Sequence, residues 1–151
     1  MMKPKSTALQ YLIYLLSRRD YSEYELRQKL HQKQYDELEI EQAIEKVQSQ
    51  NWQSDERFCQ HFIRYRSTQG YGPRRIQQEL RLKGIKSDII SLGLEECDVD
   101  WFDIAERLFE KKRPAVLDLK GKQKMWRYML SHGFDNDHFS HLMELDDEYE
   151  Q

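Results

Sequence analysis

The sequence contains few of the residues that build disulfide-stabilised or membrane-spanning proteins. It has two cysteines in 151 residues, Cys59 and Cys97, without a short-range pairing pattern. A small secreted scaffold would carry more, so we expect free thiols in a reducing compartment. No apolar run approaches membrane length, and no signal peptide is visible at the start. These absences predict a soluble, cytoplasmic protein that makes no membrane contact.

The residues that favour β-strands are also scarce. Val and Thr are rare and alternating apolar runs are absent, whereas Leu, Glu, Gln, Lys and Arg are common. The composition is 38% hydrophobic and 34% charged. Such a chain buries several small cores more easily than one thick core. We therefore predict an all-α protein of extended surface.

Pairs of apolar residues four positions apart recur along the chain. Steps of 50 and 49 residues separate the pairs, which are Leu26 with Leu30, Ile76 with Leu80, and Met125 with Met129. A period of this size indicates a repeat architecture. We predict a tandem repeat of three three-helix units, about nine helices, forming a curved, elongated, solenoid-like monomer. The units are expected at residues 1–52, 53–99 and 100–151, the last with an acidic tail (Asp146, Asp147, Glu148 and Glu150).

Capping residues mark the expected helix ends. Ser22 with Glu25 forms a capping box, Gly72 takes the matching place in the second unit, and Gly121 takes it in the third. Gly84 and Gly133 are expected to end the second helices in a left-handed conformation. The first helices are expected at 8–17, 57–66 and 102–111, and the third helices at 38–48, 88–96 and 137–145. Asp36, Ser87 and Asn136 are the expected caps of the third helices.

Apolar residues at helical spacing are expected to form the core. Leu12, Phe62 and Leu108 occupy corresponding positions in the three first helices. Trp52, Trp101 and Trp126 are expected to be core residues or anchors between units.

The net charge of −3 conceals two basic blocks. Residues 57–86 contain eight basic residues against the single acid Glu79, a net +7, and residues 111–127 contain seven against Asp118, a net +6. On the expected helix 73–83, Ile76 and Leu80 face inward and leave the arginines outside. A one-signed surface of this kind indicates an anionic partner, although a solvated helix face is the simpler reading.

Two groups of basic residues are the candidate partner-binding or DNA-binding residues. Guanidinium groups can form bidentate hydrogen bonds with phosphates or carboxylates, and the neighbouring Tyr65 and Tyr71 can contribute stacking interactions with a partner. The first group is Arg64, Arg66, Arg74, Arg75, Arg81, Lys83 and Lys86, and the second is Lys122, Lys124 and Arg127.

The sequence offers little for catalysis. No P-loop or pair of catalytic carboxylates stands out, and Cys59 and His61 point to different sides of a helix. His138 and His141 lie one helical turn apart, near two aspartates, but a metal site would need further ligands. We therefore expect no enzyme, metal or cofactor.

Several stretches resemble the RecX proteins, regulators of the RecA recombinase. The central stretch carries Asp55, Phe58, Phe62, Arg66, Gly70-Tyr71-Gly72, Arg75-Ile76, Glu79-Leu80 and Lys83-Gly84-Ile85. The start carries Arg18, Ser22, Glu25-Leu26 and Lys29-Leu30, and "MWRYMLSHGFDNDHF" resembles the closing repeat. The resemblance extends over nearly the whole chain.

This resemblance implies tandem three-helix repeats and a regulatory role without a cofactor or catalytic residue. It implies binding to the RecA–single-stranded-DNA filament, with contact to single- or double-stranded DNA through the filament, and inhibition of ATP hydrolysis and strand exchange. DNA recombination, DNA repair and the SOS response would be the setting. Two alternatives stay open: a direct, largely sequence-independent nucleic-acid-binding protein, and a scaffold with no anionic target.

Overall fold

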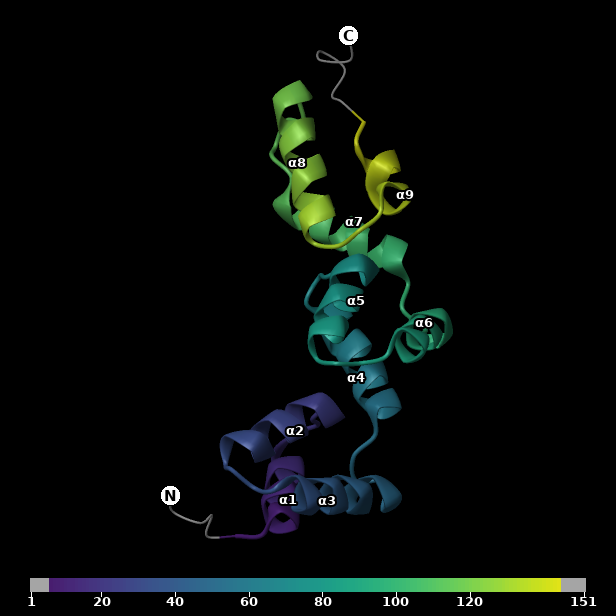
Figure 1. Cartoon of the computed structure of the whole chain (residues 1–151). Helices are drawn as coiled ribbons and strands as arrows, with labels where there is room; N and C mark the ends of the chain where they lie inside the picture. Colours follow the sequence, from purple (N-terminus) through teal and green to yellow (C-terminus); the bar gives the residue numbers. More distant parts are fainter. Residues whose placement is uncertain (1–5, 145–151) are drawn as a thin grey trace. The chain divides into compact units, whose positions relative to one another are not determined.

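The described part of the chain, residues 6–144 of a computed structural model, is helical, with no strand in that range (Figure 1). The expectation of an all-α repeat fold is confirmed. The helices are α1 (Ala8–Arg18), α2 (Glu23–Gln32), α3 (Glu37–Ser49), α4 (Asp55–Thr68), α5 (Pro73–Leu82), α6 (Ser87–Glu96), α7 (Trp101–Lys112), α8 (Leu119–Ser131), α9 (Asn136–Phe139) and the 3-10 turn η1 (Ser140–Leu142). The expected acidic tail and the expected helix end at Leu145 lie outside the described residues.

The contacts divide the chain into two compact units that each include part of the middle repeat. Unit 1 comprises residues 1–61 and 80–93, and unit 2 comprises residues 62–79 and 94–151. The division crosses α4 and α5, so the start of α5 belongs to unit 2 and its end to unit 1. The repeat boundaries after residues 52 and 99 stay a prediction.

The core of unit 1 lies among α1, α2 and α3. Leu12, Leu26 and Leu30 are fully buried, as the helical spacing predicts. Ile40 and Val47 on α3 close the same cluster. The apolar stripe of each helix thus faces a shared small core.

The core of unit 2 shows that two predicted core positions were wrong by one residue. Phe109 and Ile63 are buried, whereas the predicted Leu108 and Phe62 are only partly covered. The buried stripe of α7 runs through Ala105 and Phe109, four residues apart. A shift of one residue turns a side chain by about 100° around a helix, so the neighbour takes the inner place.

The three tryptophans do not behave alike. Trp52 is 45% exposed, so it is not a core residue, and its alternative role as an anchor between units stays a prediction. Trp101 and Trp126 are partly buried and pack against the core of unit 2. The ring of Trp126 meets Phe139 edge to face, with centroids 5.0 Å apart.

Most of the helix ends follow the capping predictions. The Ser22–Glu25 capping box is present, Asp36 caps α3, and both Gly84 and Gly133 are left-handed, with φ of 77° and 95°. Three starts differ from expectation. Asp118 caps α8 in place of Gly121, Asp135 replaces Asn136 at α9, and Ser87 is already the first residue of α6. Helix α8 starts earlier because the Asp118 carboxylate accepts from the Gly121 N–H at 2.7 Å.

In unit 1, the turn that ends α5 is joined to the start of α2. The Ser22 hydroxyl donates to the Lys83 carbonyl at 2.7 Å. Gly84 lies so close to Tyr24 that a Cβ at this glycine would overlap the tyrosine. Helices α2, α5 and α8 are the second helices of the three repeats. We call a contact between the start of one of them and the turn after the end of the next one a turn-to-helix joint.

Unit 2 contains a second turn-to-helix joint, between the start of α5 and the end of α8. The Gly72 N–H donates to the His132 carbonyl at 2.7 Å, and the Arg74 N–H donates to the Gly133 carbonyl at 3.0 Å. Both acceptors belong to the end of a helix, where carbonyls lack partners within the helix. The joint therefore satisfies groups that would otherwise be left without a hydrogen bond.

Substitution of Gly72 by alanine is expected to destabilise unit 2. The new Cβ would lie 2.5 Å from the carbonyl carbon and oxygen of Gly133, and moving these backbone atoms would cost more free energy than rotating a side chain. We expect a loss on the order of 2 kcal/mol in the free energy of unfolding, measured by denaturant titration. Gly121→Ala is the control, because its nearest neighbour is the movable Asp118 side chain at 3.2 Å. Equal losses in both variants would contradict the close packing at Gly72.

Candidate cationic interface

The ten candidate basic residues are divided between the two units. Arg81, Lys83 and Lys86 belong to unit 1. The other seven belong to unit 2 and come from α4, α5 and α8: Arg64, Arg66, Arg74, Arg75, Lys122, Lys124 and Arg127.

Arg66 and Glu79 form a bidentate pair in unit 2. Arg66 Nε and Nη2 donate to the two Glu79 carboxylate oxygens at 2.8 and 2.7 Å. Arg75 Nε lies 3.5 Å from the same carboxylate. The hydrogen bonds from Arg66 hold the pKa of Glu79 below its ordinary value despite partial burial, and they raise the pKa of Arg66. This carboxylate is thus ionised at neutral pH and engaged with two guanidinium groups.

Tyr71 lies at the centre of the same cluster. The guanidinium carbons of Arg66 and Arg75 lie 4.0 and 4.4 Å from its ring centroid. The His132 ring stacks on Tyr71 at 5.3 Å and meets Tyr128 at 4.2 Å. Burial, with the nearby Tyr71, raises the pKa of Tyr128. The two arginines thus contribute cation–π contacts next to the joint of unit 2.

The two arginines at the start of α5 also contact the turn between α8 and α9. Arg74 Nε lies 2.6 Å from a carboxylate oxygen of Asp135. Arg75 Nη1 donates to the Ser131 carbonyl at 3.3 Å. Both side chains therefore reinforce the joint between α5 and α8.

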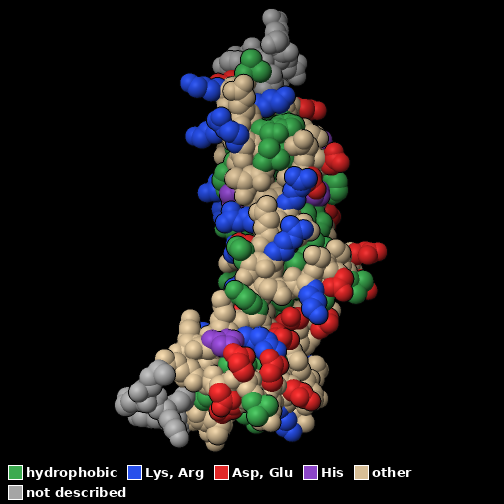
Figure 2. All heavy atoms as spheres, in the orientation of Figure 1, with side chains coloured by type: hydrophobic (Ala, Val, Ile, Leu, Met, Phe, Trp, Pro, Cys, Tyr) green, Lys and Arg blue, Asp and Glu red, His purple; other side chains and the backbone are tan. Residues whose placement is uncertain are grey.

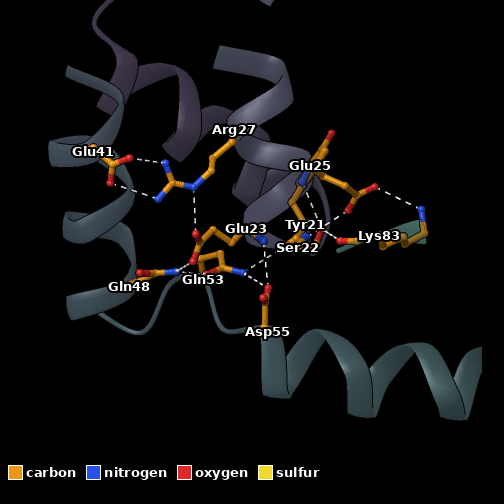
Figure 3. Close-up of polar contacts among 10 residues, drawn as sticks. All are labelled: Tyr21, Ser22, Glu23, Glu25, Arg27, Glu41, Gln48, Gln53, Asp55 and Lys83. Carbon is orange, nitrogen blue, oxygen red and sulfur yellow. Dashed lines mark hydrogen bonds and ion pairs between the residues drawn. The ribbon is translucent and has the colours of Figure 1, made fainter. Parts of the chain in front are cut away.

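Lys83 has a similar place in unit 1. Its ammonium lies 3.2 Å from Glu25 (Figure 3). Arg19 also approaches this carboxylate, at 3.5 Å. Burial raises the pKa of Glu25, but the N–H of Ser22 and the two cations outweigh burial and hold this pKa below its ordinary value. Lys83 thus neutralises the carboxylate of the α2 capping box.

Figure 3 also shows a polar network at the start of α2 that the sequence did not reveal. Arg27 bridges Glu23 and Glu41, with N–O distances of 2.9 and 2.5 Å. The Glu23 N–H donates to the Asp55 carboxylate at 2.9 Å. Asp55, one of the residues behind the RecX resemblance, therefore ties the start of α4 to the start of α2.

The structure corrects the expectation that these basic groups lack carboxylate partners. Arg66, Arg74, Arg75 and Lys83 are all paired within the chain. Two of their partners lie far away in the sequence, so a local count of acids missed them. Six candidates have no ion-pair partner among residues 6–144, and they are Arg64, Arg81, Lys86, Lys122, Lys124 and Arg127.

A groove in unit 2 collects unpaired cations beside α8. It encloses about 690 Å³ between the end of α7, the following link and one side of α8. Its basic lining residues are Lys112, Lys120, Lys124 and Arg127, and its apolar ones are Pro114, Val116, Met125 and Tyr128. Lys and Arg side chains gather on one side of the upper part of the molecule in Figure 2. We call it the α8 groove; the sequence had not singled out Lys112 and Lys120 as site residues.

The other features that suggested chemistry have structural roles. His138 Nδ1 accepts from the Asp135 N–H at 3.0 Å and so belongs to the cap of α9. Within residues 6–144, no three His, Cys, Asp or Glu side chains come together as metal ligands would. Cys59 and Cys97 form no disulfide with each other. None of the helices in the described part of the chain is both long and apolar enough to span a membrane.

Comparison with known proteins identifies the family. Residues 8–46 match the profile of the first three-helix domain of RecX, and residues 54–94 match that of the second. Two curated relatives, both named Regulatory protein RecX, come from Actinobacillus pleuropneumoniae serotype 5b (strain L20) and Haemophilus ducreyi. The first is 66% identical over 93% of each chain. The second is 65% identical over 97% of this chain and 99% of the relative.

The chain belongs to the RecX family. Two solved structures support the fold of this RecX protein. The crystal structure of RecX from Lactobacillus salivarius has a TM-score of 0.74 at 20% identity and covers 90% of this chain and 92% of its own. Another, titled crystal structure of regulatory protein RecX, has a TM-score of 0.75 at 22% identity over 88% of this chain and 68% of its own.

Several residues behind the RecX resemblance form contacts within this RecX protein. Gly72 and Lys83-Gly84 form the two joints, and the Arg66–Glu79 pair lies beside Tyr71. The unpaired cations of the α8 groove lie in a different part of unit 2. The groove is thus the better candidate for contact with a partner.

Loss of the Glu79 charge should make this RecX protein less sensitive to acid. The folded-state pKa of Glu79 lies below its ordinary value of 4.5, so its ionised form stabilises the fold above about pH 4.5. This contribution disappears as the pH falls through the lowered pKa. We expect Glu79→Gln to cost about 1 kcal/mol at pH 7 and less toward pH 3, measured by chemical denaturation across this range. A difference between the two proteins that stayed constant with pH would contradict the assignment.

Proposed function

We propose that this RecX protein is a non-catalytic regulator that binds the RecA–single-stranded-DNA filament and inhibits its ATPase and strand-exchange activities. The observation that carries the proposal is the α8 groove, with four cations that have no ion-pair partner among residues 6–144. The name of its relatives, Regulatory protein RecX, supports a regulatory role. The filament itself is the partner that the family resemblance implies.

The unpaired cations suit a partner that is anionic and extended. Lys124 and Arg127 are exposed on α8 beside the groove, with the partly covered Lys122 on the same helix. Ammonium and guanidinium groups with no internal carboxylate gain most from an external phosphate or carboxylate. Arg64, Arg81 and Lys86 are further exposed cations that can add to such contacts.

Neutralisation of the groove cations should weaken inhibition without unfolding the protein. We expect Lys124→Gln with Arg127→Gln to raise the half-inhibiting concentration for DNA-stimulated ATP hydrolysis by roughly tenfold, which corresponds to about 1.4 kcal/mol. Lys33→Gln with Lys46→Gln removes two exposed cations of unit 1 that form no ion pair with another described residue, and it should change little. Charge reversal at Arg74 and Arg75 is a poorer test, because it would also replace their ion pairs with Asp135 and Glu79 by like-charge contacts.

The same double variant separates the proposal from direct nucleic-acid binding. The alternative has some support, because Tyr128 lies among the groove cations and could stack on a base. It requires tight binding to DNA without the recombinase, falling steeply with salt as counterions are released. Such binding, lost in the double variant, would favour the alternative. Unchanged inhibition by the well-folded double variant would rule out the groove as the contact surface.

A further inference from the structure

The α8 groove corresponds in the repeat to the surface that forms the joints elsewhere. The 50- and 49-residue steps align Gly121 in sequence with Ser22 and Gly72, and α8 itself starts after Asp118, which lines the same groove. Ser22 and Gly72 each bond to the turn that ends the next second helix. Gly121 lines the α8 groove, and its nearest neighbours are Asp118, Pro114 and Leu117 from its own repeat. Within residues 6–144, no turn from another repeat occupies this third position.

The lining of the groove defines what would fit there. Four cations line it, and its one lining carboxylate, Asp118, already accepts from the Gly121 N–H. Met125 and Tyr128 add an apolar part. An acidic peptide segment that also carries apolar side chains matches both properties, because carboxylates pair with the cations while apolar groups leave water.

The chain contains such a segment directly after the described residues. Residues 145–151 read LDDEYEQ, with four acids beside Leu145 and Tyr149. Met143 is buried in the same core as Met125, so the segment follows a residue anchored close to the groove. Seven extended residues reach about 24 Å, and the 13 residues of α8 extend about 20 Å, so the length suffices.

We propose that residues 145–151 dock in the α8 groove of the same molecule and compete there with the anionic partner. A second copy of the chain is a poorer occupant. The turn that it would offer, at the end of α2, carries Lys29 and Lys33, which the groove cations repel. The competition with the partner rests on the proposed function, whereas the docking does not.

The docking can be tested on the isolated protein by backbone amide NMR. The tail variant replaces Asp146 and Asp147 by Asn and Glu148 and Glu150 by Gln. We expect the amide signals of residues 120–128 to shift between wild type and the tail variant, with no dependence on protein concentration. Added salt should move the wild-type signals toward those of the tail variant, since screening weakens the contact. In a Lys124→Gln, Arg127→Gln background, tail neutralisation should shift these signals much less.

A matched control changes four exposed carboxylates outside the tail that form no ion pair with described residues: Glu45, Glu95, Glu96 and Asp98. It should leave residues 120–128 unchanged. Tail-dependent shifts confined to residues 144–151 would overturn the docking, as would equal shifts from the control. Shifts that vanish on dilution would assign the groove to a second copy instead.

The regulatory consequence has a separate readout. If the tail competes for the groove, the tail variant should inhibit DNA-stimulated ATP hydrolysis at a severalfold lower concentration than wild type. Docking seen by NMR with unchanged inhibition would refute the competition but leave the docking. Absence of inhibition by every variant, wild type included, would refute the proposed function instead.

Discussion

The hydrogen-bonding need of helix ends governs this structure. The last carbonyls of a helix have no partner within it, and a short helix has few turns over which to spread that cost. In each unit, the start of one second helix supplies the donors: the Ser22 hydroxyl for α5, and the Gly72 and Arg74 amides for α8. Close approach needs a residue without a side chain at the contact, which Gly84 provides in unit 1 and Gly72 in unit 2.

The joints also determine which charges are available to a partner. A helix start that receives a backbone turn brings acidic and basic side chains from two repeats together, and most of them then pair. Arg74 meets Asp135 and Lys83 meets Glu25 in this way. The number of basic residues in a sequence segment therefore overstates the positive charge available to a partner, because part of this charge stabilises the contact between repeats. The cations that form no ion pair among residues 6–144, those of the α8 groove together with Arg64, Arg81 and Lys86, are the ones available to another molecule.

Local features of the sequence predicted the helices well, since spacing and caps act over a few residues. The Ser22–Glu25 box and the left-handed Gly84 were read directly from the chain. It was harder to predict which residues of the first helices face the core. Adjacent apolar residues such as Phe62 and Ile63 both fit a helical stripe, and only the packing determines which of them is buried. Ion pairs across repeats were out of reach: the partners Lys83 and Glu25 are 58 residues apart, and no local pattern connects them.

The cations of the α8 groove need an explanation beyond stability. Like charges around one groove repel each other within the Debye length of about 10 Å at 0.1 M salt, so their grouping costs folding energy. At the joints, by contrast, several of the same residue types lie next to carboxylates, as Arg74 does with Asp135. Bringing an anion to the groove removes the repulsion and gains charge-assisted hydrogen bonds at once. Residues 6–144 alone leave that gain unused, so an anion from outside this range, whether the tail or a partner, accounts for the arrangement better than the stability of the fold does.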